Sequence, residues 1–161
     1  MAQAEGCHLP ETYAVAMMFL TDDFQKEVFS EICLKNDLKV LLFREVPINK
    51  DALGEQALSN LPTIYQAFVV PNALIATQRF ESLIYLTRKE TEQAFKADLN
   101  FYFASFSSQT ISYKGLVMPT FIKDFYIDLQ AKDFEVSFSL FHQRFSTNTL
   151  PRWGMAQPFR S

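Results

Sequence analysis

The sequence predicts one globular domain that mixes β-strands with α-helices. Its 161 residues suit a single domain, because domains commonly run about 100–150 residues. Short apolar runs alternate with amphipathic stretches, and we find neither an internal repeat nor a domain linker. The chain contains 17 Phe, 6 Tyr and 1 Trp but only 4 Gly, a composition that argues against disorder. The order of elements is compatible with either an antiparallel or a parallel sheet.

The first third of the chain predicts a strand, a helix and a second strand. Tyr13 to Leu20 is a nearly continuous apolar run, typical of a strand buried on both faces. Thr21 or Asp22 can cap the helix that follows. Its predicted apolar stripe consists of Phe24, Val28, Phe29, Ile32 and Cys33. Lys39 to Val46 reads as the second strand, and Pro47 limits its hydrogen-bond ladder.

The middle of the chain predicts one more strand and a solvated helix. About one helical turn is expected around Asp51 to Leu58, inside a polar connection. Thr63 to Val70 has strand character. Leu83 to Leu86 reads as a further buried run, and Arg88 to Lys96 reads as a helix with a charged, solvated surface.

The last third predicts three strands and a short helix. Phe101 to Phe106 and Gln109 to Tyr113 read as neighbouring strands around a Ser107-Ser108 turn, since aromatic and β-branched residues suit a pleated surface. Pro119 to Leu129 reads as a short helix that packs Phe121, Phe125 and Leu129 inward. Phe134 to Phe145 alternates with a period of two and predicts the last strand.

Charge and hydropathy exclude several classes of protein. The net charge is −3 with acids and bases interspersed, so we expect no basic face for nucleic acid. No apolar run reaches about 18 residues, so we expect no membrane span. The first residues carry no positive cluster before an apolar core, so no secretory signal is visible. We therefore expect a cytoplasmic or organelle-matrix setting.

Cysteine and histidine usage gives no sign of a metal or redox site. Cys7 and Cys33 are too far apart for a metal knuckle or a Cys-x-x-Cys pair, and Cys33 is expected to fill an apolar helix face. His8 and His142 are each solitary, and we assign them no catalytic role. We expect no metal ligands in this chain.

One polar segment near the end of the chain is the strongest candidate site. His142-Gln-Arg-Phe-Ser-Thr-Asn-Thr149 places an arginine and several hydroxyls directly after an apolar, strand-like run. Such a group suits an anion-binding rim, because a guanidinium can make two parallel hydrogen bonds to a carboxylate. The alternative is a surface strand end in which Ser146 and Asn148 satisfy local backbone groups.

Six blocks of the chain together resemble the class II glutamine amidotransferase domain of glutamate synthase. The segment from His142 is one of them. The other five blocks, in chain order, are Tyr13-Ala-Val-Ala-Met-Met-Phe-Leu, Arg44-Glu-Val-Pro-Ile, Ala52-Leu-Gly-Glu, Gln109-Thr-Ile-Ser-Tyr-Lys-Gly-Leu and Phe125-Tyr-Ile-Asp-Leu. They occur in the order expected of that family and cover nearly the whole chain. The combination is far more specific than any single block.

The resemblance implies a fold that the pattern left open. It implies an α+β protein that forms part of an N-terminal nucleophile hydrolase αββα sandwich, in which two antiparallel sheets face each other under helices. Residues 1–161 are then expected to be an internal segment of one such domain, incomplete at both ends.

The resemblance also implies the substrate-binding residues. Arg144 is expected to bind the α-carboxylate of glutamine, which lysine could not grip in the same bidentate way. Thr147 matches a position that touches the same substrate group, and Phe145 matches the pocket wall. Lys114 and Gly115 belong to a family block, but we expect them to form only a structural turn.

The reaction implied by the resemblance needs parts that we do not find in this sequence. The family's nucleophile is a cysteine at the mature N-terminus, activated by its own α-amine, and its oxyanion hole comes from a His-Asn-Gly-Glu-Ile-Asn segment. Neither is recognisable here. We therefore assign no catalytic residue and expect the chain alone to be inactive.

The expected partners are glutamine and the remainder of a glutamate synthase chain. In that enzyme, the resemblance implies, ammonia from glutamine passes to 2-oxoglutarate in a domain with FMN and an iron–sulfur cluster; we expect no cofactor in this segment. The alternative function is a non-catalytic carboxylate-binding module or a structural remnant of the same fold. A third possibility is an aromatic-rich domain in which the arginine is incidental.

Overall fold

The fold is built on one antiparallel sheet of four strands. The computed structural model describes residues 6–143 and 152–156. Its strands are β1 (Ala14–Leu20), β2 (Leu38–Glu45), β3 (Thr63–Pro71) and β4 (Tyr102–Ser107). Their order across the sheet is β2-β3-β1-β4, and every neighbouring pair is antiparallel. β1 is therefore a central strand, consistent with its nearly complete burial.

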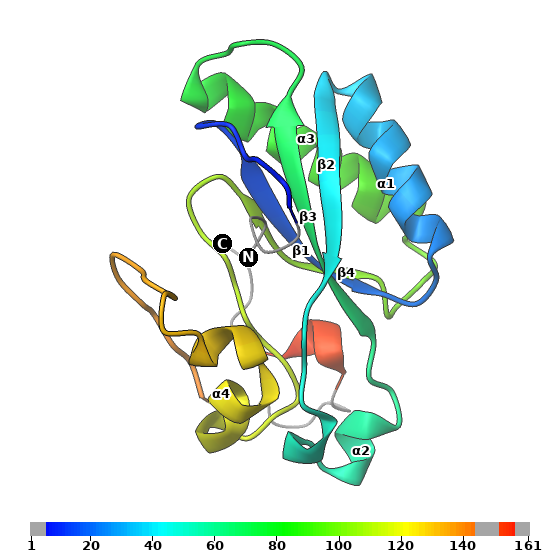
Figure 1. The fold of residues 1–161 in the computed structure, drawn as a ribbon. Coiled ribbons are helices and arrows are strands. Elements are labelled where there is room, and N and C mark those ends of the chain that lie inside the picture. The colour runs from blue at the N-terminus through cyan, green and yellow to red at the C-terminus, as the bar shows by residue number, and fades with distance from the viewer. Residues whose placement is uncertain (1–5, 144–151, 157–161) are drawn as a thin grey trace.

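Two long helices cover one face of this sheet (Figure 1). They are α1 (Phe24–Lys35) and α3 (Thr77–Ala94). Phe29 and Cys33 of α1 pack with Phe80 and Ile84 of α3 against the strand residues on this face. The ring centroid of Phe29 lies 5.6 Å from those of Phe103 and Phe106 on β4.

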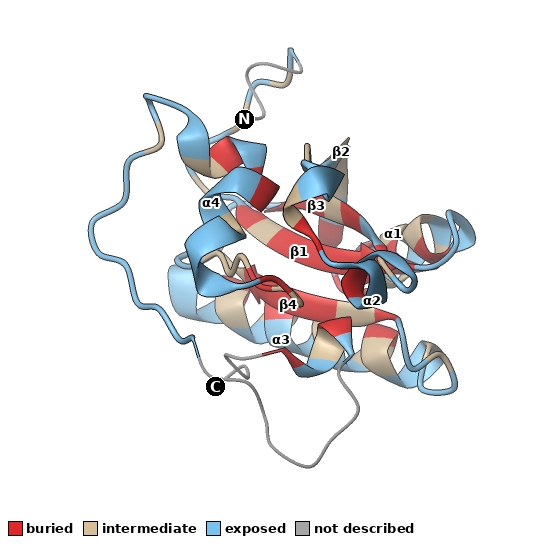
Figure 2. Cartoon of the chain, turned by 90° about the horizontal axis from the view of Figure 1, so that it is seen from below, coloured by how far each residue is buried: buried red, intermediate tan, exposed pale blue. Residues whose placement is uncertain are grey.

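Short helical turns pack against the opposite face, and in Figure 1 they lie toward the lower end of the sheet. They are η2 (Lys50–Ala52), α2 (Glu55–Leu58), η3 (Pro119–Phe121), α4 (Ile122–Phe125), η4 (Ile127–Gln130) and η5 (Trp153–Met155). Met17 and Phe19 of β1 pack here with Phe125, Tyr126 and Trp153. Since successive side chains of a strand point to opposite faces, β1 contributes to both cores. Figure 2 shows its nearly unbroken burial in red.

Backbone hydrogen bonds join the connection after β2 to the α4 layer. The amide of Asn49 donates to the carbonyl of Phe125 over 2.8 Å, and the amide of Ile127 donates to the carbonyl of Pro47 over 3.2 Å. An isolated bridge between Ile48 and Tyr126 lies between these two bonds. The short turns on this face are thus tied to the end of β2, although they are distant in sequence.

Most of the predicted elements are confirmed. The strands expected at residues 13–20, 39–46, 63–70 and 101–106 correspond to β1, β2, β3 and β4. The expected helix after Asp22 is α1, and the Asp22 carboxylate accepts a hydrogen bond from the Phe24 amide over 2.8 Å. Phe24 does not join the buried stripe, however, since it is 59% exposed in the first turn.

The interpretation of residues 79–96 was wrong in its first half. The buried run expected at residues 83–86 belongs to α3, and only Ile84 of those four is buried. The buried positions of α3 are Phe80, Ile84, Thr87 and Thr91, which follow helical spacing. Two of them are threonines, so the helical stripe is not apparent from hydropathy alone.

Two predicted strands are absent from the described residues. Residues 109–113 run beside β4 without forming a strand, and the Ser112 amide donates to the Ser105 side-chain oxygen over 3.0 Å. Residues 134–143 likewise form no strand, and Val136, Phe138 and Leu140 are exposed. Alternation sets which way side chains point, but a ladder needs a neighbouring strand, and no described strand pairs with this segment.

The short helix expected at residues 119–129 is confirmed as three consecutive turns. Phe125 is fully buried and Leu129 packs against the same core. Phe121 was expected to point inward but is 43% exposed at the end of η3, the turn that precedes α4.

The α+β class is confirmed, with antiparallel pairing throughout the described sheet. That sheet accounts for one of the two sheets that the resemblance implies. No helix in residues 6–143 and 152–156 is long and apolar enough to cross a membrane.

Candidate functional site

A groove of about 1010 Å³ lies on the face of the molecule that carries α4. Residues 109–117 form one wall, residues 134–143 form a second, and Arg152, Met155 and Ala156 form a third. Apolar side chains such as Leu116 and Ile122 alternate with polar groups along the lining. Mostly apolar concave sites with a few convergent polar groups are typical of small-molecule binding sites.

The predicted glutamine-binding residues lie outside the described part of the chain. This applies to Arg144, Phe145 and Thr147, and also to Ser146 and Asn148. The described residues on either side of them are Gln143 and Arg152, and both line the groove. The groove is therefore the described feature that adjoins the predicted site along the chain.

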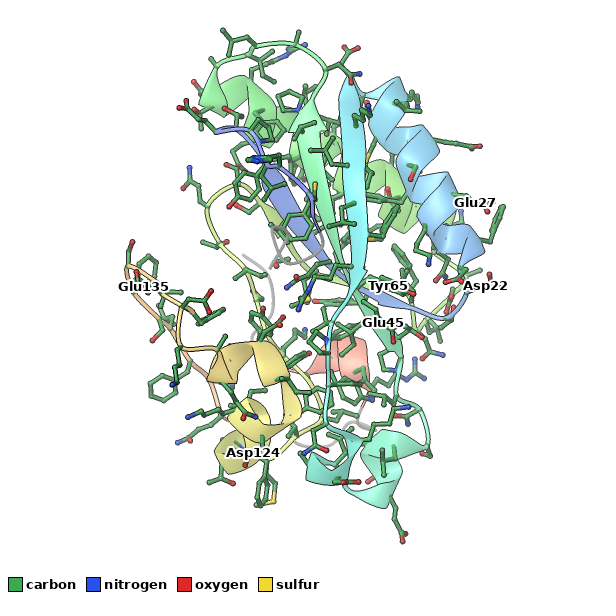
Figure 3. All side chains as sticks on the ribbon, in the orientation of Figure 1. Asp22, Glu27, Glu45, Tyr65, Asp124 and Glu135 are labelled. Carbon is green, nitrogen blue, oxygen red and sulfur yellow. The ribbon has the colours of Figure 1, made fainter. Side chains whose placement is uncertain are left out.

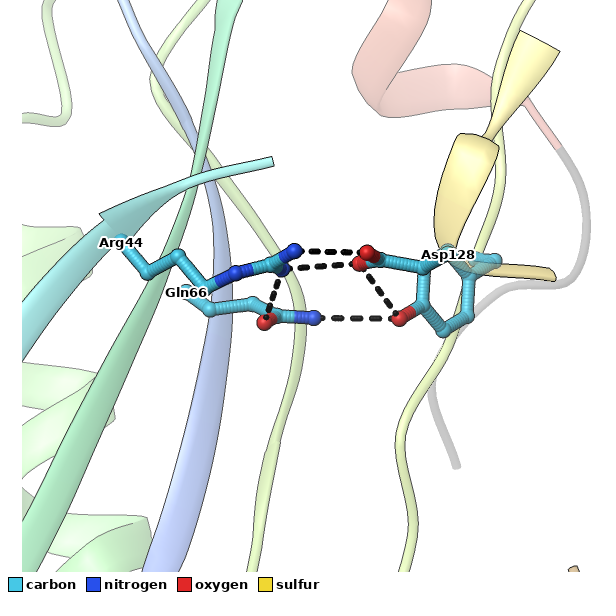
Figure 4. A network of polar contacts seen from close by, with 4 residues as sticks. Arg44, Gln66 and Asp128 are labelled. Carbon is cyan, nitrogen blue, oxygen red and sulfur yellow. Dashed lines mark hydrogen bonds and ion pairs between the residues drawn. The ribbon is translucent and has the colours of Figure 1, made fainter. Parts of the chain in front are cut away.

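Tyr113, in the first wall, is hydrogen-bonded to a polar network that contains Arg44, Gln66 and Asp128 (Figure 4 labels these three). Gln66 on β3 donates from Nε2 to the Tyr113 hydroxyl over 3.1 Å, and that hydroxyl donates to Asp128 Oδ2 over 3.2 Å. Burial and the nearby Asp128 charge raise the pKa of Tyr113. Its hydroxyl therefore stays a hydrogen-bond donor at neutral pH.

The same network contains a bidentate ion pair between the sheet and the layer above it. Arg44 on β2 donates from Nη1 to Asp128 Oδ2 over 2.8 Å and from Nη2 to Asp128 Oδ1 over 2.6 Å. Arg44 Nη1 also donates to Gln66 Oε1 over 3.0 Å. The side chains of Arg44 and Asp128 are only 10% and 7% exposed, so both charges depend on these partners.

A second tyrosine, Tyr126, contacts the first wall at Lys114, the residue that follows Tyr113. The hydroxyl of Tyr126 donates to the carbonyl of Lys114 over 2.7 Å, and its ring meets that of Tyr113 edge-on at 4.9 Å. Tyr126 is fully buried, and burial raises the pKa of its hydroxyl. The backbone at Lys114 is thus fixed by a side chain of the α4 layer.

Sequence reasoning missed the four residues of this network. Arg44 and Gln66 each interrupt an apolar strand, and a polar group in a buried strand needs a partner. A polar residue within an apolar strand could therefore have been predicted to need a hydrogen-bond partner. The sequence pattern does not identify that partner. Lys114 and Gly115, expected to form only a turn, line the groove.

The remaining candidate residues add no metal site. His142 is exposed and lines the groove, whereas His8 is exposed in the segment before β1. Burial raises the pKa of the Cys33 thiol to about 12. Across residues 6–143 and 152–156, no group of three His, Cys, Asp or Glu side chains is placed to hold a metal ion.

Comparison with protein families gives one match that covers the chain. The model for class-II glutamine amidotransferases matches residues 1–161. The chain belongs to the class-II glutamine amidotransferases. The groove and the network therefore lie in a segment of an amidotransferase domain, and the expected resemblance is confirmed at the level of the family.

The similar proteins are glutamate synthases. A ferredoxin-dependent glutamate synthase of Cyanidium caldarium is 44% identical over 157 residues, which is 91% of this chain and 10% of that protein. The NADPH glutamate synthase large chain of Bacillus subtilis is 38% identical over 167 residues, covering 98% of this chain and 11% of that protein. The chain thus spans about a tenth of the length of the curated relatives it matches.

Three segments that carry the resemblance meet in the network. Arg44 comes from one matching block, Tyr113 from a second and Asp128 from a third. Segments of this amidotransferase chain that lie 84 residues apart are therefore joined by direct hydrogen bonds behind the groove.

Proposed function

We propose that this segment supplies the glutamine-binding side of an amidotransferase domain in a glutamate synthase. The observation that carries the proposal is the groove, because its lining includes Gln143 and Arg152, the described residues on either side of the predicted site along the chain. Family membership and the glutamate synthase relatives support the choice of glutamine as ligand.

In this proposal Arg144 binds the α-carboxylate of glutamine. A planar guanidinium offers two parallel donors to a carboxylate, and such charge-assisted bonds are about twice as strong as neutral ones. Thr147 contributes a hydroxyl or amide to the same group, and Phe145 forms part of the pocket wall. The amide of the substrate is hydrolysed to glutamate and ammonia, by a nucleophile that we do not assign within this sequence.

The ammonia serves reductive amination of 2-oxoglutarate in the same longer protein. We propose that FMN and an iron–sulfur cluster act in that step and are bound by other regions of the protein. The amidotransferase segment then has the rest of the glutamate synthase chain as its partner. We propose a cytoplasmic setting for the protein, and its two free cysteines fit a reducing compartment.

The test is glutamine kinetics in the natural, full-length protein with Arg144→Ala and Arg144→Lys. Loss of hydrogen bonds to a charged group costs about 1.5–3 kcal/mol. That loss corresponds to a rise in the KM for glutamine of roughly 10- to 150-fold. Arg144→Lys should recover little, because a lysine ammonium cannot reproduce the bidentate geometry.

Arg79→Ala is the matched control, since Arg79 is exposed on α3 and does not line the groove. It should leave the KM unchanged. An unchanged KM in both Arg144 variants would overturn the assignment of the carboxylate site. Glutamine binding by calorimetry without glutamate release would instead favour the non-catalytic, carboxylate-binding alternative.

A further inference from the structure

Lys114 is a lysine buried beneath the groove. It is 2% exposed, and its Nζ donates to the carbonyl of Gly154 over 3.0 Å. The same Nζ lies 4.3 Å from the centroid of the Tyr102 ring, a cation–π distance. Burial of an ammonium group is costly unless such partners compensate it. These contacts therefore tie the ammonium to the η5 turn and to β4.

Gly115 fits directly against the ring of Trp153. A Cβ atom added at Gly115 would lie 2.5 Å from Cζ3 of Trp153, which is closer than packed atoms approach. Trp153 has little freedom to move away, because its Nε1 donates to the carbonyl of Ala57 over 3.2 Å and its ring meets Phe19 edge-on at 5.9 Å. Glycine is thus required here for close approach.

These contacts join two walls of the groove. Lys114 and Gly115 belong to the first wall, and η5 places Arg152 and Met155 in the third. The bond from Lys114 to Gly154 and the packing of Gly115 on Trp153 fix η5 against the first wall. Both contacts therefore lie where the first and third walls meet.

We propose that Lys114 is a positioning residue for the glutamine groove, acting through η5. The proposal rests on the proposed function above, because it takes glutamine as the ligand of the groove. Lys114 acts on affinity: without its bond to Gly154, η5 shifts and Arg152 and Met155 leave their places in the lining. Gly115 serves the same junction through shape.

The experiment compares glutamine kinetics of Lys114→Met, Lys114→Arg and Gly115→Ala in the full-length natural protein, with glutamate release as the readout. Methionine nearly keeps the length of the lysine side chain but removes the ammonium donor. We expect Lys114→Met to raise the KM about tenfold, the lower end for loss of a hydrogen bond from a charged group. The kcat should change by less than about threefold, because a positioning residue of this kind acts on substrate affinity.

Lys114→Arg should restore most of the affinity, since it keeps a cationic donor at this position. Gly115→Ala should raise the KM similarly while leaving the ammonium in place. In the double variant Lys114→Met with Gly115→Ala, the KM should rise by less than the product of the two single increases, because both substitutions disrupt the same contact between η5 and the first wall. The matched controls are Lys132→Met, at an exposed lysine, and Gly54→Ala, where an added Cβ meets nothing within 4 Å.

Arg144→Ala, measured in the same assay, separates failure of this inference from failure of the proposed function. If Arg144→Ala raises the KM while Lys114→Met and Gly115→Ala do not, the positioning role is overturned and the glutamine site stands. If Arg144→Ala has no effect, both are overturned. Should Lys114→Met fail to fold, Gly115→Ala decides the matter. If Lys114→Met and Gly115→Ala lower both kcat and thermal stability but leave the KM unchanged, the positioning role is also overturned. Lys114 would then have a purely structural role.

Discussion

At the scale of single residues, Arg44 and Asp128 form a buried ion pair. Both side chains are almost fully buried, and their two bonds measure 2.6 and 2.8 Å. Breaking a buried pair leaves an uncompensated charge, whereas replacing both members with apolar residues can be nearly neutral. The pair therefore makes the position of η4 specific without necessarily adding net stability.

We predict that Asp128→Asn destabilises the protein by about 3–5 kcal/mol, because it removes the buried carboxylate that pairs with the Arg44 guanidinium. The double variant Arg44→Met with Asp128→Leu should lose much less. Denaturant unfolding of the single and double variants measures both values. If Asp128→Asn lost less free energy of unfolding than the double variant, this account of the pair would be contradicted.

At the scale of elements, α3 shows how polar residues can occupy a buried helix stripe. Thr87 and Thr91 are both fully buried. The Thr91 hydroxyl donates to the carbonyl of Thr87 over 2.8 Å, whereas the Thr87 hydroxyl has no hydrogen-bond partner within the described residues. An unsatisfied buried polar group costs about 1–3 kcal/mol. The two positions thus differ in energy although they look alike in sequence.

We predict that Thr87→Val stabilises the protein, by up to about 1–3 kcal/mol, since valine has a similar shape without the unpaired hydroxyl. Thr91→Val is the matched comparison and should give no such gain, because it removes a hydrogen bond that is made. Thermal melting of the two variants measures the difference. A gain for Thr91→Val equal to that for Thr87→Val would show that the hydroxyls do not matter.

The segment after η4 shows how an element depends on its surroundings. Residues 134–143 have the period of a strand but no strand partner among the described residues. Glu135 lies on this segment, away from the sheet (Figure 3). Phe138, Leu140 and Phe141 are between 72% and 87% exposed. All three side chains line the groove.

At the scale of the whole molecule, ionisable groups are buried in both cores. Cys33 lies in the core under α1 and α3, and Tyr126 lies in the core under α4, with Tyr113 packed against it. Burial raises the pKa of all three, from ordinary values of 9.0 for the thiol and 10.0 for the hydroxyls. The folded state therefore keeps these protons at pH values where the unfolded chain releases them.

We predict that this protein loses stability as pH rises above about 9. At pH values below the unfolded pKa of each group, its stabilisation of the folded state is complete. Between the unfolded and the folded pKa, each group lowers the free energy of unfolding by about 1.4 kcal/mol per pH unit. Cys33 acts from pH 9.0 to about 12, and the tyrosines act from pH 10.0 upward. Urea unfolding at a series of pH values measures the slope.

Tyr126→Phe and Cys33→Ala should each make the slope above these values shallower. Tyr85→Phe, at a position 57% exposed, is the control for the substitution itself. A slope that is the same in every variant would show that other groups cause the alkaline loss.

Local patterns in the sequence were sufficient for the four strands, for α1, for the short turns between β2 and β3 and for those that follow β4. Apolar runs and helical spacing act over a few neighbouring residues, so they can be read without the fold. The same patterns failed for residues 83–86, 109–113 and 134–143, where burial or strand pairing depends on distant residues. Arg144, Phe145 and Thr147 remain predictions that derive from the resemblance.

Alone, the sequence determined the family and the order of elements, because both are recorded in residue identity along the chain. Only the tertiary structure decided that β3 lies between β1 and β2, that Arg44 meets Asp128, and that Lys114 meets Gly154. These contacts join residues up to 84 positions apart. Their energies depend on geometry and burial that no local pattern encodes, so the groove and the residues that position its walls emerge only from the folded chain.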